Sequence, residues 1–376
     1  MTDKKPLCYA PFIHVHASKY GYAPCCVYLD KQECNSPEDY WSSEHLKDLR
    51  IKMLEGNGLP SSCSVCTSKI KNGISSDLDH WNYKSLDVYV ETSVDYGNQT
   101  KKPFFLEYKP SNKCNLMCRM CKPDDSNLIY DEAVSNGDLR KFYHNTRPLN
   151  NNIDNIESFV NSVKELHVLG GEPALEHKAL SFLDKAYQLN PSVKLKVTTN
   201  ATSYNKKFID SISRFKDLRV MLSIDAVGKT YEYIRTNAKW KNTNANVHKM
   251  LNEGFTKRFG FTAVITPYNI FNIIELLEWY LQLPNYKDIF FYFCDSDDLK
   301  TSISCILDEH KEQTIDLLYL NHTRLKDAPV SDIIDLLTKI QFNKSHYDMF
   351  VSYNKTLDNL RKTNLSDLDV RFKEYI

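Results

Sequence analysis

The strongest constraint on the fold is an alternation of short β-rich runs with amphipathic runs between about residues 104 and 294. We expect six strands there, at residues 104–108, 165–169, 193–198, 219–224, 260–265 and 289–294. Helical periodicity fills the stretches between them, at residues 178–188, 206–215, 244–253 and 270–281. Strands interleaved with helices favour a parallel α/β sheet, which can curl into a partial (β/α)6 barrel. Ligands of such barrels bind at the carboxyl ends of the strands.

Length and cysteine distribution predict two further domains around this barrel. A chain of 376 residues exceeds a typical single core. We expect a small cysteine-rich domain over residues 1–100, the barrel over residues 101–300, and a helical extension over residues 301–376. A helix is predicted at residues 43–54, a polar linker at residues 92–103, and helical spacing continues around residues 333–340.

Charge and hydropathy exclude several classes of function. Lys+Arg and Asp+Glu both number 48, so the net charge gives no indication of a nucleic-acid-binding surface. No apolar run approaches the roughly 18 to 20 residues of a membrane span, and the first residues lack the apolar segment of a signal peptide. We therefore expect a cytoplasmic protein whose thiols stay reduced, and grouped cysteines there more often mark metal sites than disulfides.

Three cysteines follow the first predicted barrel strand with the spacing C-x3-C-x2-C: Cys114, Cys118 and Cys121. Three thiolates on one loop can hold three irons of a [4Fe–4S] cube and leave the fourth iron open. A closed zinc site needs a fourth ligand, and none stands close in sequence. Spacing alone favours the cluster and leaves zinc open.

Polar segments follow the next strands. Gly170-Gly171-Glu172-Pro173, here called the GGEP segment, would let a ligand approach the backbone closely and carries a negative charge at Glu172. A plain strand-to-helix turn would give the same residues. Asn200 follows the third strand, where it could instead cap a helix. Ser223 and Asp225 end the fourth strand, and Arg235 could bind a carboxylate bidentately or lie on a helix surface.

The triplet and these segments resemble the radical S-adenosylmethionine (SAM) superfamily, whose fold is a partial TIM-like barrel. The resemblance implies that a [4Fe–4S] cluster on the triplet binds SAM through its open iron. It also implies that the GGEP segment binds the methionine amino group, that Asn200, Ser223 and Asp225 lie near the ribose, and that Arg235 binds the cofactor carboxylate. Ile265 would contact adenine, as would Met120, which stands where the family commonly has an aromatic residue.

Four more cysteines form two pairs near the N-terminus: Cys8 with Cys25, and Cys63 with Cys66. Their number suits a closed zinc site and a fully ligated [4Fe–4S] cluster equally. Together with Gly21, Trp41, Leu46, Leu49 and Arg50 they resemble a twitch domain, the first half of a SPASM domain, which carries one auxiliary iron–sulfur cluster. Such domains usually follow the barrel, whereas this candidate precedes it.

Other metal-binding residue types have weaker claims. Cys26 could replace Cys25 as a ligand, and Cys34 is a further alternative. His14 and His16 share one face if they lie on a strand, which indicates a polar face or a substrate contact more than a metal site. Cys294 and Cys305 have no partners in spacing, so we interpret both as structural.

The resemblance implies a radical mechanism. One electron from the reduced cluster would cleave SAM to a 5′-deoxyadenosyl radical, which would abstract hydrogen from a substrate in the barrel. We favour a peptide or protein side chain as substrate over a small molecule, with an electron donor such as flavodoxin or ferredoxin. The alternatives are a zinc-stabilised binding protein and a non-catalytic barrel scaffold.

Overall fold

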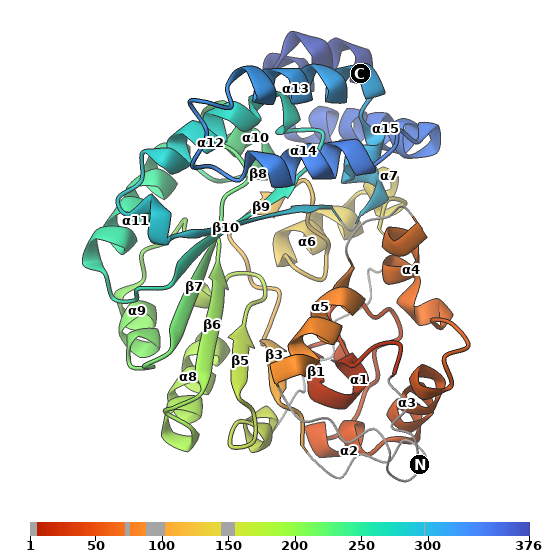
Figure 1. Cartoon of the computed structure of the whole chain (residues 1–376), viewed down its shortest axis with the longest axis vertical. Helices are drawn as coiled ribbons and strands as arrows, with labels where there is room; N and C mark the ends of the chain where they lie inside the picture. Colours follow the sequence, from red (N-terminus) through yellow and green to blue (C-terminus); the bar gives the residue numbers. More distant parts are fainter. Residues whose placement is uncertain (1–5, 72–75, 88–101, 144–154, 297) are drawn as a thin grey trace. The chain divides into compact units, whose positions relative to one another are not determined.

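The structure is a computed structural model that describes residues 6–71, 76–87, 102–143, 155–296 and 298–376 (Figure 1). The chain forms two compact units, and each is assembled from separated stretches. The first unit contains Met1–Ser111, Pro148–Thr198 and Lys206–Leu218, and the second contains Asn112–Arg147, Thr199–Asn205 and Arg219–Ile376. The division at residues 100 and 300 stays a prediction, and the linker expected at residues 92–103 lies outside the described residues except for its last two.

Strands of the first unit pair in the order β2-β1-β3-β5-β6. All these pairs are parallel except the hairpin of β1 and β2. The bounds are β1 His14–Ser18, β2 Gly21–Ala23, β3 Phe105–Lys109, β5 Glu165–Val168 and β6 Lys194–Thr199. An N-terminal strand therefore extends the sheet that begins with the first predicted barrel strand.

The two faces of this sheet differ because side chains alternate along each strand. One face is apolar and packs against α8 (His177–Leu189), where Tyr108 and Phe182 lie 4.5 Å apart between ring centroids. The opposite face carries His14, His16 and Glu107. Helix α5 (Asp77–Lys84) covers part of it, since Trp81 stacks on His14 at 4.0 Å.

Short helices complete the first unit (Figure 1). Their bounds are α1 Ala10–Ile13, α2 Pro37–Trp41, α3 Glu44–Glu55, α4 Ser64–Lys71 and α9 Lys206–Ser213. Helix α3 begins where the Ser43 hydroxyl accepts a hydrogen bond from the Leu46 backbone and ends at Gly56, whose φ of 75° lies in the left-handed region.

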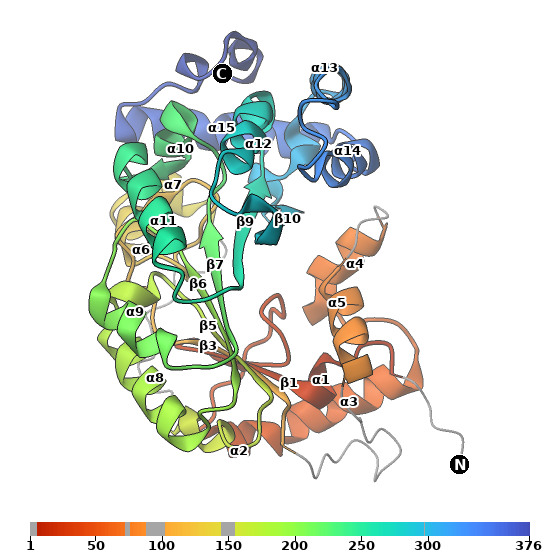
Figure 2. The ribbon, with the colours of Figure 1, turned by 60° about the vertical axis from the view of Figure 1, so that its left-hand side comes forward.

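The second unit contains the parallel strands β7, β9 and β10 and most of the remaining helices (Figure 2). Its strands are β4 Met117–Cys118, β7 Leu218–Ser223, β8 Arg235–Thr236, β9 Phe259–Ile265 and β10 Phe290–Asp295. Its helices are α6 Asn127–Ser135, α7 Gly137–Arg140, α10 Gly228–Ile234, α11 Trp240–Glu253, α12 Ile273–Leu281, α13 Asp308–Leu320, α14 Val330–Lys339 and α15 Lys344–Arg361.

The predicted fold class is confirmed: the main strands form a largely parallel α/β fold consistent with a partial TIM-like barrel. Each of the six predicted strands lies within one residue of a strand in the structure at both ends. The helical extension is also confirmed, as α13, α14 and α15. Among the described residues, no helix is long and apolar enough to cross a membrane.

Candidate functional site

The cysteine triplet lies on the segment that follows β3, within the second unit. Cys118 is buried in β4, which pairs antiparallel with β8 so that Cys118 faces Arg235. The backbone N–H of Cys114 donates to the Asn127 side chain at 2.9 Å, at the start of α6. Neighbouring elements thus hold two of the three cysteines, Cys114 and Cys118.

Two thiols of the triplet interact directly. A hydrogen bond from the Cys121 thiol lowers the pKa of Cys118 below its usual value, and the charge of Arg235 acts in the same direction against the effect of burial. The Arg235 Nη1 atom lies 3.9 Å from the Cys118 Sγ atom. A thiolate at Cys118 is therefore favoured, and the thiolate is the form of cysteine that binds metals.

Arg235 is held in place by Asp225. The Asp225 carboxylate accepts hydrogen bonds from Nε of Arg235 at 2.8 Å and forms an ion pair with its Nη2 at 2.6 Å. The same carboxylate accepts from the Val264 backbone at 2.9 Å. Both charges are buried, so each depends on the other for compensation. The structure therefore brings together Cys118, Asp225 and Arg235, which sequence reasoning treated as separate candidates.

Asn200 lies beside the first cysteine of the triplet. Its Nδ2 atom lies 3.9 Å from the Cys114 Sγ atom and donates to the Asn115 side chain at 3.1 Å. The Asn200 side-chain oxygen accepts from Thr202, so the side chain closes a small turn as well. Of the other predicted contacts in this unit, Ser223 and Met120 are half-buried and Ile265 is fully buried.

The GGEP segment belongs to the first unit and follows β5. Gly170 has a φ of 141°, and a Cβ atom there would lie 2.8 Å from the Ser111 carbonyl oxygen. Gly171 donates its backbone N–H to the same oxygen at 3.2 Å. Glu172 is buried and accepts from the Ala174 backbone at 3.1 Å, just before the turn that begins with Pro173. The segment thus makes a tight turn and holds a buried carboxylate.

The N-terminal cysteines lie near one another in the first unit. Burial raises the pKa of Cys8 to about 12, with smaller contributions in the same direction from Cys63 and Cys66 and an opposing one from a backbone hydrogen bond of Ala10. Burial also raises the pKa of Cys25, with contributions from Cys26, Cys8 and Cys66. These mutual effects place Cys8, Cys25, Cys63 and Cys66 in one cluster of thiols.

The two alternative ligands stand differently. Cys26 directs its thiol toward the Asp77 carboxylate, 3.9 Å away at the start of α5. Burial and the charge of Asp39 raise the pKa of Cys34, and no other cysteine contributes to this shift. Cys305 is buried, with its thiol 3.1 Å from the Leu299 carbonyl oxygen, as expected of a structural cysteine.

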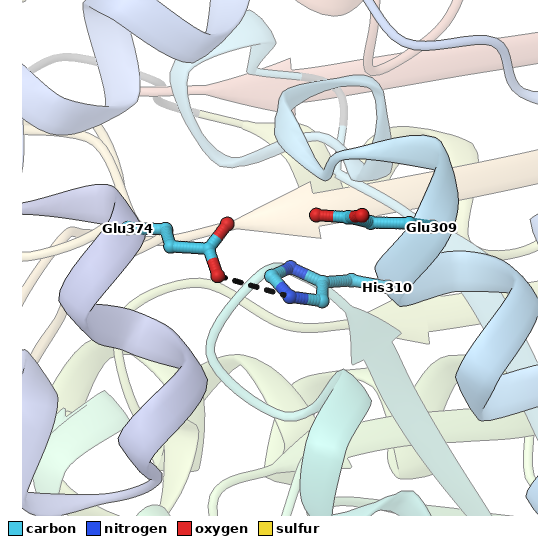
Figure 3. A group of neighbouring side chains, drawn as sticks. All are labelled: Glu309, His310 and Glu374. Carbon is cyan, nitrogen blue, oxygen red and sulfur yellow. Dashed lines mark ion pairs between the residues drawn. The ribbon is translucent and has the colours of Figure 1, made fainter.

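Neither cysteine set is arranged for a single ion. Zn–S bonds of about 2.3 Å would keep all ligand sulfurs within roughly 4.6 Å of one another. Among the described residues, only Glu309, His310 and Glu374 form a group of three metal-binding side chains with ligand atoms within 4.8 Å (Figure 3). A cluster distributes its ligands over several irons, so the cysteines that hold one need not lie that close together.

Sequence reasoning missed the group in Figure 3 because its members come from α13 and from residues more than sixty positions later. His310 is buried, its Nδ1 atom lies 2.8 Å from the Tyr375 hydroxyl, and its Nε2 atom lies 3.7 Å from Glu374. The two glutamates are exposed. The histidine is thus already engaged by neighbours that stabilise the last turn of the chain.

A row of polar residues crosses the first unit's sheet in register: His16, Glu107, His167 and Lys196. The Glu107 carboxylate lies between two imidazoles, 2.7 Å from Nδ1 of His16 and 3.3 Å from Nδ1 of His167. Burial lowers the pKa of His16 to about 4 despite this carboxylate. The predicted polar strand face is therefore present, with a buried carboxylate that the sequence did not reveal.

Residues 108–280 match the model of the Radical SAM superfamily. The chain carries a radical SAM domain. Radical SAM domains use a [4Fe–4S] cluster and S-adenosylmethionine, and the three thiols after β3, one of them favoured as a thiolate, fit the cluster.

Curated relatives of the chain include two GTP 3',8-cyclases of Helicobacter pylori strains, 25% and 26% identical over 178 residues. The aligned part covers 46% of this chain, and the chain spans about half the length (51%) of these relatives. Similar solved structures include Streptococcus suis SuiB bound to the precursor peptide SuiA, at 16% identity and a TM-score of 0.40, covering 83% of this chain and 70% of that one. A structure of anSMEcpe with bound AdoMet has 18% identity and a TM-score of 0.40, covering 59% and 62%.

Replacement of Gly170 by alanine should destabilise the protein by about 1–3 kcal/mol, because the new Cβ atom meets the Ser111 carbonyl and the positive φ disfavours a side chain. Chemical unfolding measures the loss. The matched control is Gly137→Ala, which meets nothing within 4 Å and should change stability by less than about 0.5 kcal/mol. Equal stability of the two variants would contradict the close approach.

Stability should fall as the pH drops below about 6.5, partly because of His16. The folded protein lowers the pKa of His16 from 6.5 to about 4, so between these values the unfolded chain takes up a proton that the folded chain excludes. His16→Asn should reduce the slope of unfolding free energy against pH in this window by up to about 1.4 kcal/mol per pH unit. Urea unfolding at several pH values tests this, with the exposed His322→Asn as control; an unchanged slope in His16→Asn would refute it.

Proposed function

We propose that the protein is an enzyme that uses SAM at a [4Fe–4S] cluster held by Cys114, Cys118 and Cys121. The observation that carries this proposal is the set of three thiols on the loop after β3, in which a hydrogen bond from Cys121 and the charge of Arg235 lower the pKa of the buried Cys118. When bound, the cluster and SAM would supply a radical that abstracts hydrogen from substrate. The chain's own residues hold the thiols, balance their charge and exclude water.

Arg235 stabilises negative charge on the Cys118 thiol, and Asp225 holds Arg235 in position for this. Asp225 binds two nitrogens of Arg235 and leaves Nη1 on the side of the Cys118 sulfur. We assign Arg235 to the cofactor carboxylate because this nitrogen is the one that Asp225 does not bind. The fixed fork of the guanidinium means that the position of Asp225 sets the direction of Nη1.

The remaining SAM contacts stay as the sequence indicated them. The GGEP segment, Gly170 to Pro173, is assigned to the methionine amino group, since its glycines expose backbone and Glu172 is a buried carboxyl group. Asn200, Ser223 and Asp225 are assigned to the ribose, and Ile265 and Met120 to adenine. The position of Asn200 beside the Cys114 thiol supports its assignment.

We further propose that Cys8, Cys25, Cys63 and Cys66 hold an auxiliary [4Fe–4S] cluster in a twitch-like region. The mutual influence of these thiols supports the set. Cys25 is favoured over Cys26 because Cys25 is buried and Cys8 and Cys66 act on its pKa, whereas the Cys26 thiol is directed toward Asp77. Such a cluster would accept the product electron or anchor substrate.

A peptide or protein side chain is the proposed substrate, and a flavodoxin or ferredoxin is the proposed electron donor. A guanine nucleotide is the second candidate, because curated relatives of the radical SAM region are named GTP 3',8-cyclase. Incubation of the reconstituted enzyme with SAM, reductant and GTP separates the two: a new nucleotide product would favour the second candidate.

Cys118→Ala should abolish reductive cleavage of SAM, because the loop then lacks a thiolate for the cluster. The measurement is 5′-deoxyadenosine formed by anaerobically reconstituted protein with dithionite. Cys34→Ala is the matched control and should retain cleavage, since burial and Asp39 act on the pKa of this thiol and no other cysteine does. Full retention of cleavage by Cys118→Ala would sink the proposal.

Iron content tests the auxiliary cluster separately. The reconstituted protein should hold about eight irons per chain, and the Cys63→Ala/Cys66→Ala variant about four, given four irons per cubane. Cys34→Ala is the control and should keep the wild-type content. About four irons together with one zinc per chain in the wild type would instead indicate a closed zinc site at the N-terminal cysteines.

A further inference from the structure

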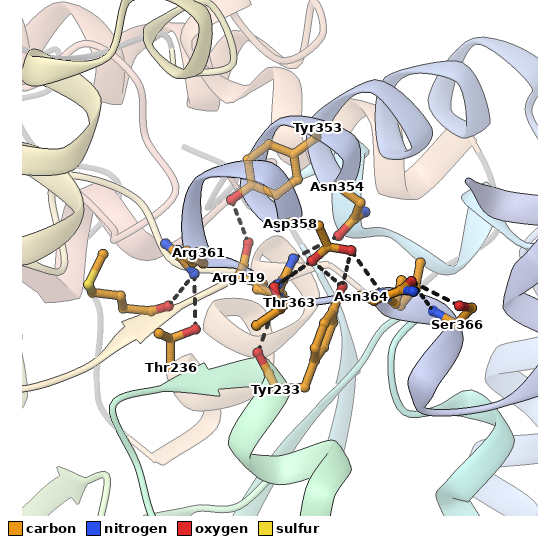
Figure 4. Close-up of polar contacts among 12 residues, drawn as sticks. Arg119, Tyr233, Thr236, Tyr353, Asn354, Asp358, Arg361, Thr363, Asn364 and Ser366 are labelled. Carbon is orange, nitrogen blue, oxygen red and sulfur yellow. Dashed lines mark hydrogen bonds and ion pairs between the residues drawn. The ribbon is translucent and has the colours of Figure 1, made fainter.

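Helix α15, far along the chain, reaches the cysteine loop with one face (Figure 4). Tyr353 donates its hydroxyl proton to the Arg119 carbonyl at 2.9 Å. Arg361 donates through Nη1 to the Met117 carbonyl at 2.8 Å. The backbone on both sides of Cys118 is therefore bonded by side chains of this helix.

Arg119, the residue after Cys118, is fully buried, and hydrogen-bond acceptors surround its guanidinium group. Its guanidinium forms an ion pair with Asp358 at 2.7 Å and donates to Asn354 at 3.2 Å and to Thr363 at 2.7 Å. It also stacks over the Tyr233 ring, 3.6 Å from the centroid. A buried guanidinium needs such compensation, so Arg119 fixes the loop to α15 as long as Asp358 is present.

A second buried ion pair joins α15 to α6. Arg361 binds the Glu132 carboxylate of α6 through Nη2 at 2.6 Å and through Nε at 2.9 Å. Both side chains are at least nine-tenths buried. The Arg361 charge also acts on the Cys118 thiol directly.

Apolar packing joins the same elements. Tyr353 and Leu357 of α15 form a core cluster with Ile129 and Ala133 of α6. The side chains of Cys121 and Met117 pack against this cluster. Helix α15 thus packs against the cysteine loop and also forms hydrogen bonds with it.

We propose that Asp358 and Arg361 of α15 are positioning residues for the [4Fe–4S] cluster of the cysteine triplet. Their helix holds the cysteine loop in place, and their opposite charges set the reduction potential of the cluster. This inference rests on the proposed assignment of the cluster to Cys114, Cys118 and Cys121. Reduction adds negative charge to the cluster, so a nearby positive charge raises the potential and a negative charge lowers it.

The two charges predict shifts of opposite sign. Arg361→Gln removes a positive charge and should lower the midpoint potential of the triplet cluster. Asp358→Asn leaves Arg119 without its counter-charge and should raise it. Arg361→Lys and Asp358→Glu keep the charges and should stay closer to the wild type, while the double variant Asp358→Asn/Arg361→Gln should fall between the single variants. A role limited to folding would not produce shifts of opposite sign.

The experiment is a redox titration of the reconstituted full chain, followed by the electron paramagnetic resonance signal of the SAM-responsive cluster. Iron content and thermal unfolding are measured on the same samples. Controls are Asp348→Asn, an exposed position on α15 itself, and Arg324→Gln, an exposed arginine in the extension. Neither control should move the potential.

If Arg361→Gln does not fold, Glu132→Gln tests the same site, because it frees the Arg361 charge and should raise the potential. Unchanged potentials, or shifts of one sign in both single variants, would overturn the positioning role. A wild-type protein without a SAM-responsive cluster would overturn the proposed function instead, so the two failures are distinguishable.

Discussion

A loop that presents three thiols cannot rely on a hydrogen-bond ladder of its own. Only Met117 and Cys118 of this loop lie in a strand, and that strand pairs with just two residues, Arg235 and Thr236. The burial of the Arg119 guanidinium supplies the missing restraint, because it requires Asp358 and the face of α15 around it. The geometry of the proposed cluster site therefore depends on a charge that does not itself touch the cysteines.

Periodicity and spacing predicted the elements of this fold well. The six barrel strands could be located because buried parallel strands are short runs of apolar and β-branched residues between amphipathic helices. Cys114, Cys118 and Cys121 were visible because their spacing lies within one loop. The contacts that hold this loop could not be predicted. In the sequence Arg119 is an ordinary charged residue, and its partner Asp358 lies 239 positions later.

The polar row on the first unit's sheet illustrates the same limit. Alternation along a strand correctly placed His14 and His16 on one face. Their partners depend on register, which aligns His16 with Glu107 and Glu107 with His167 across three strands. Sequence analysis can assign residues to a face, whereas the pairing of strands decides which of them meet.

The dependence of the cysteine loop on α15 also has a consequence for biosynthesis. A ribosome adding roughly 5–20 residues per second needs on the order of tens of seconds to travel from Arg119 to Asp358. During that interval the cysteine loop has been synthesised but α15, which packs against it, has not. Iron delivery to this loop is therefore expected to follow completion of α15, and nascent chains stalled before it should be poor acceptors for a cluster-carrying scaffold.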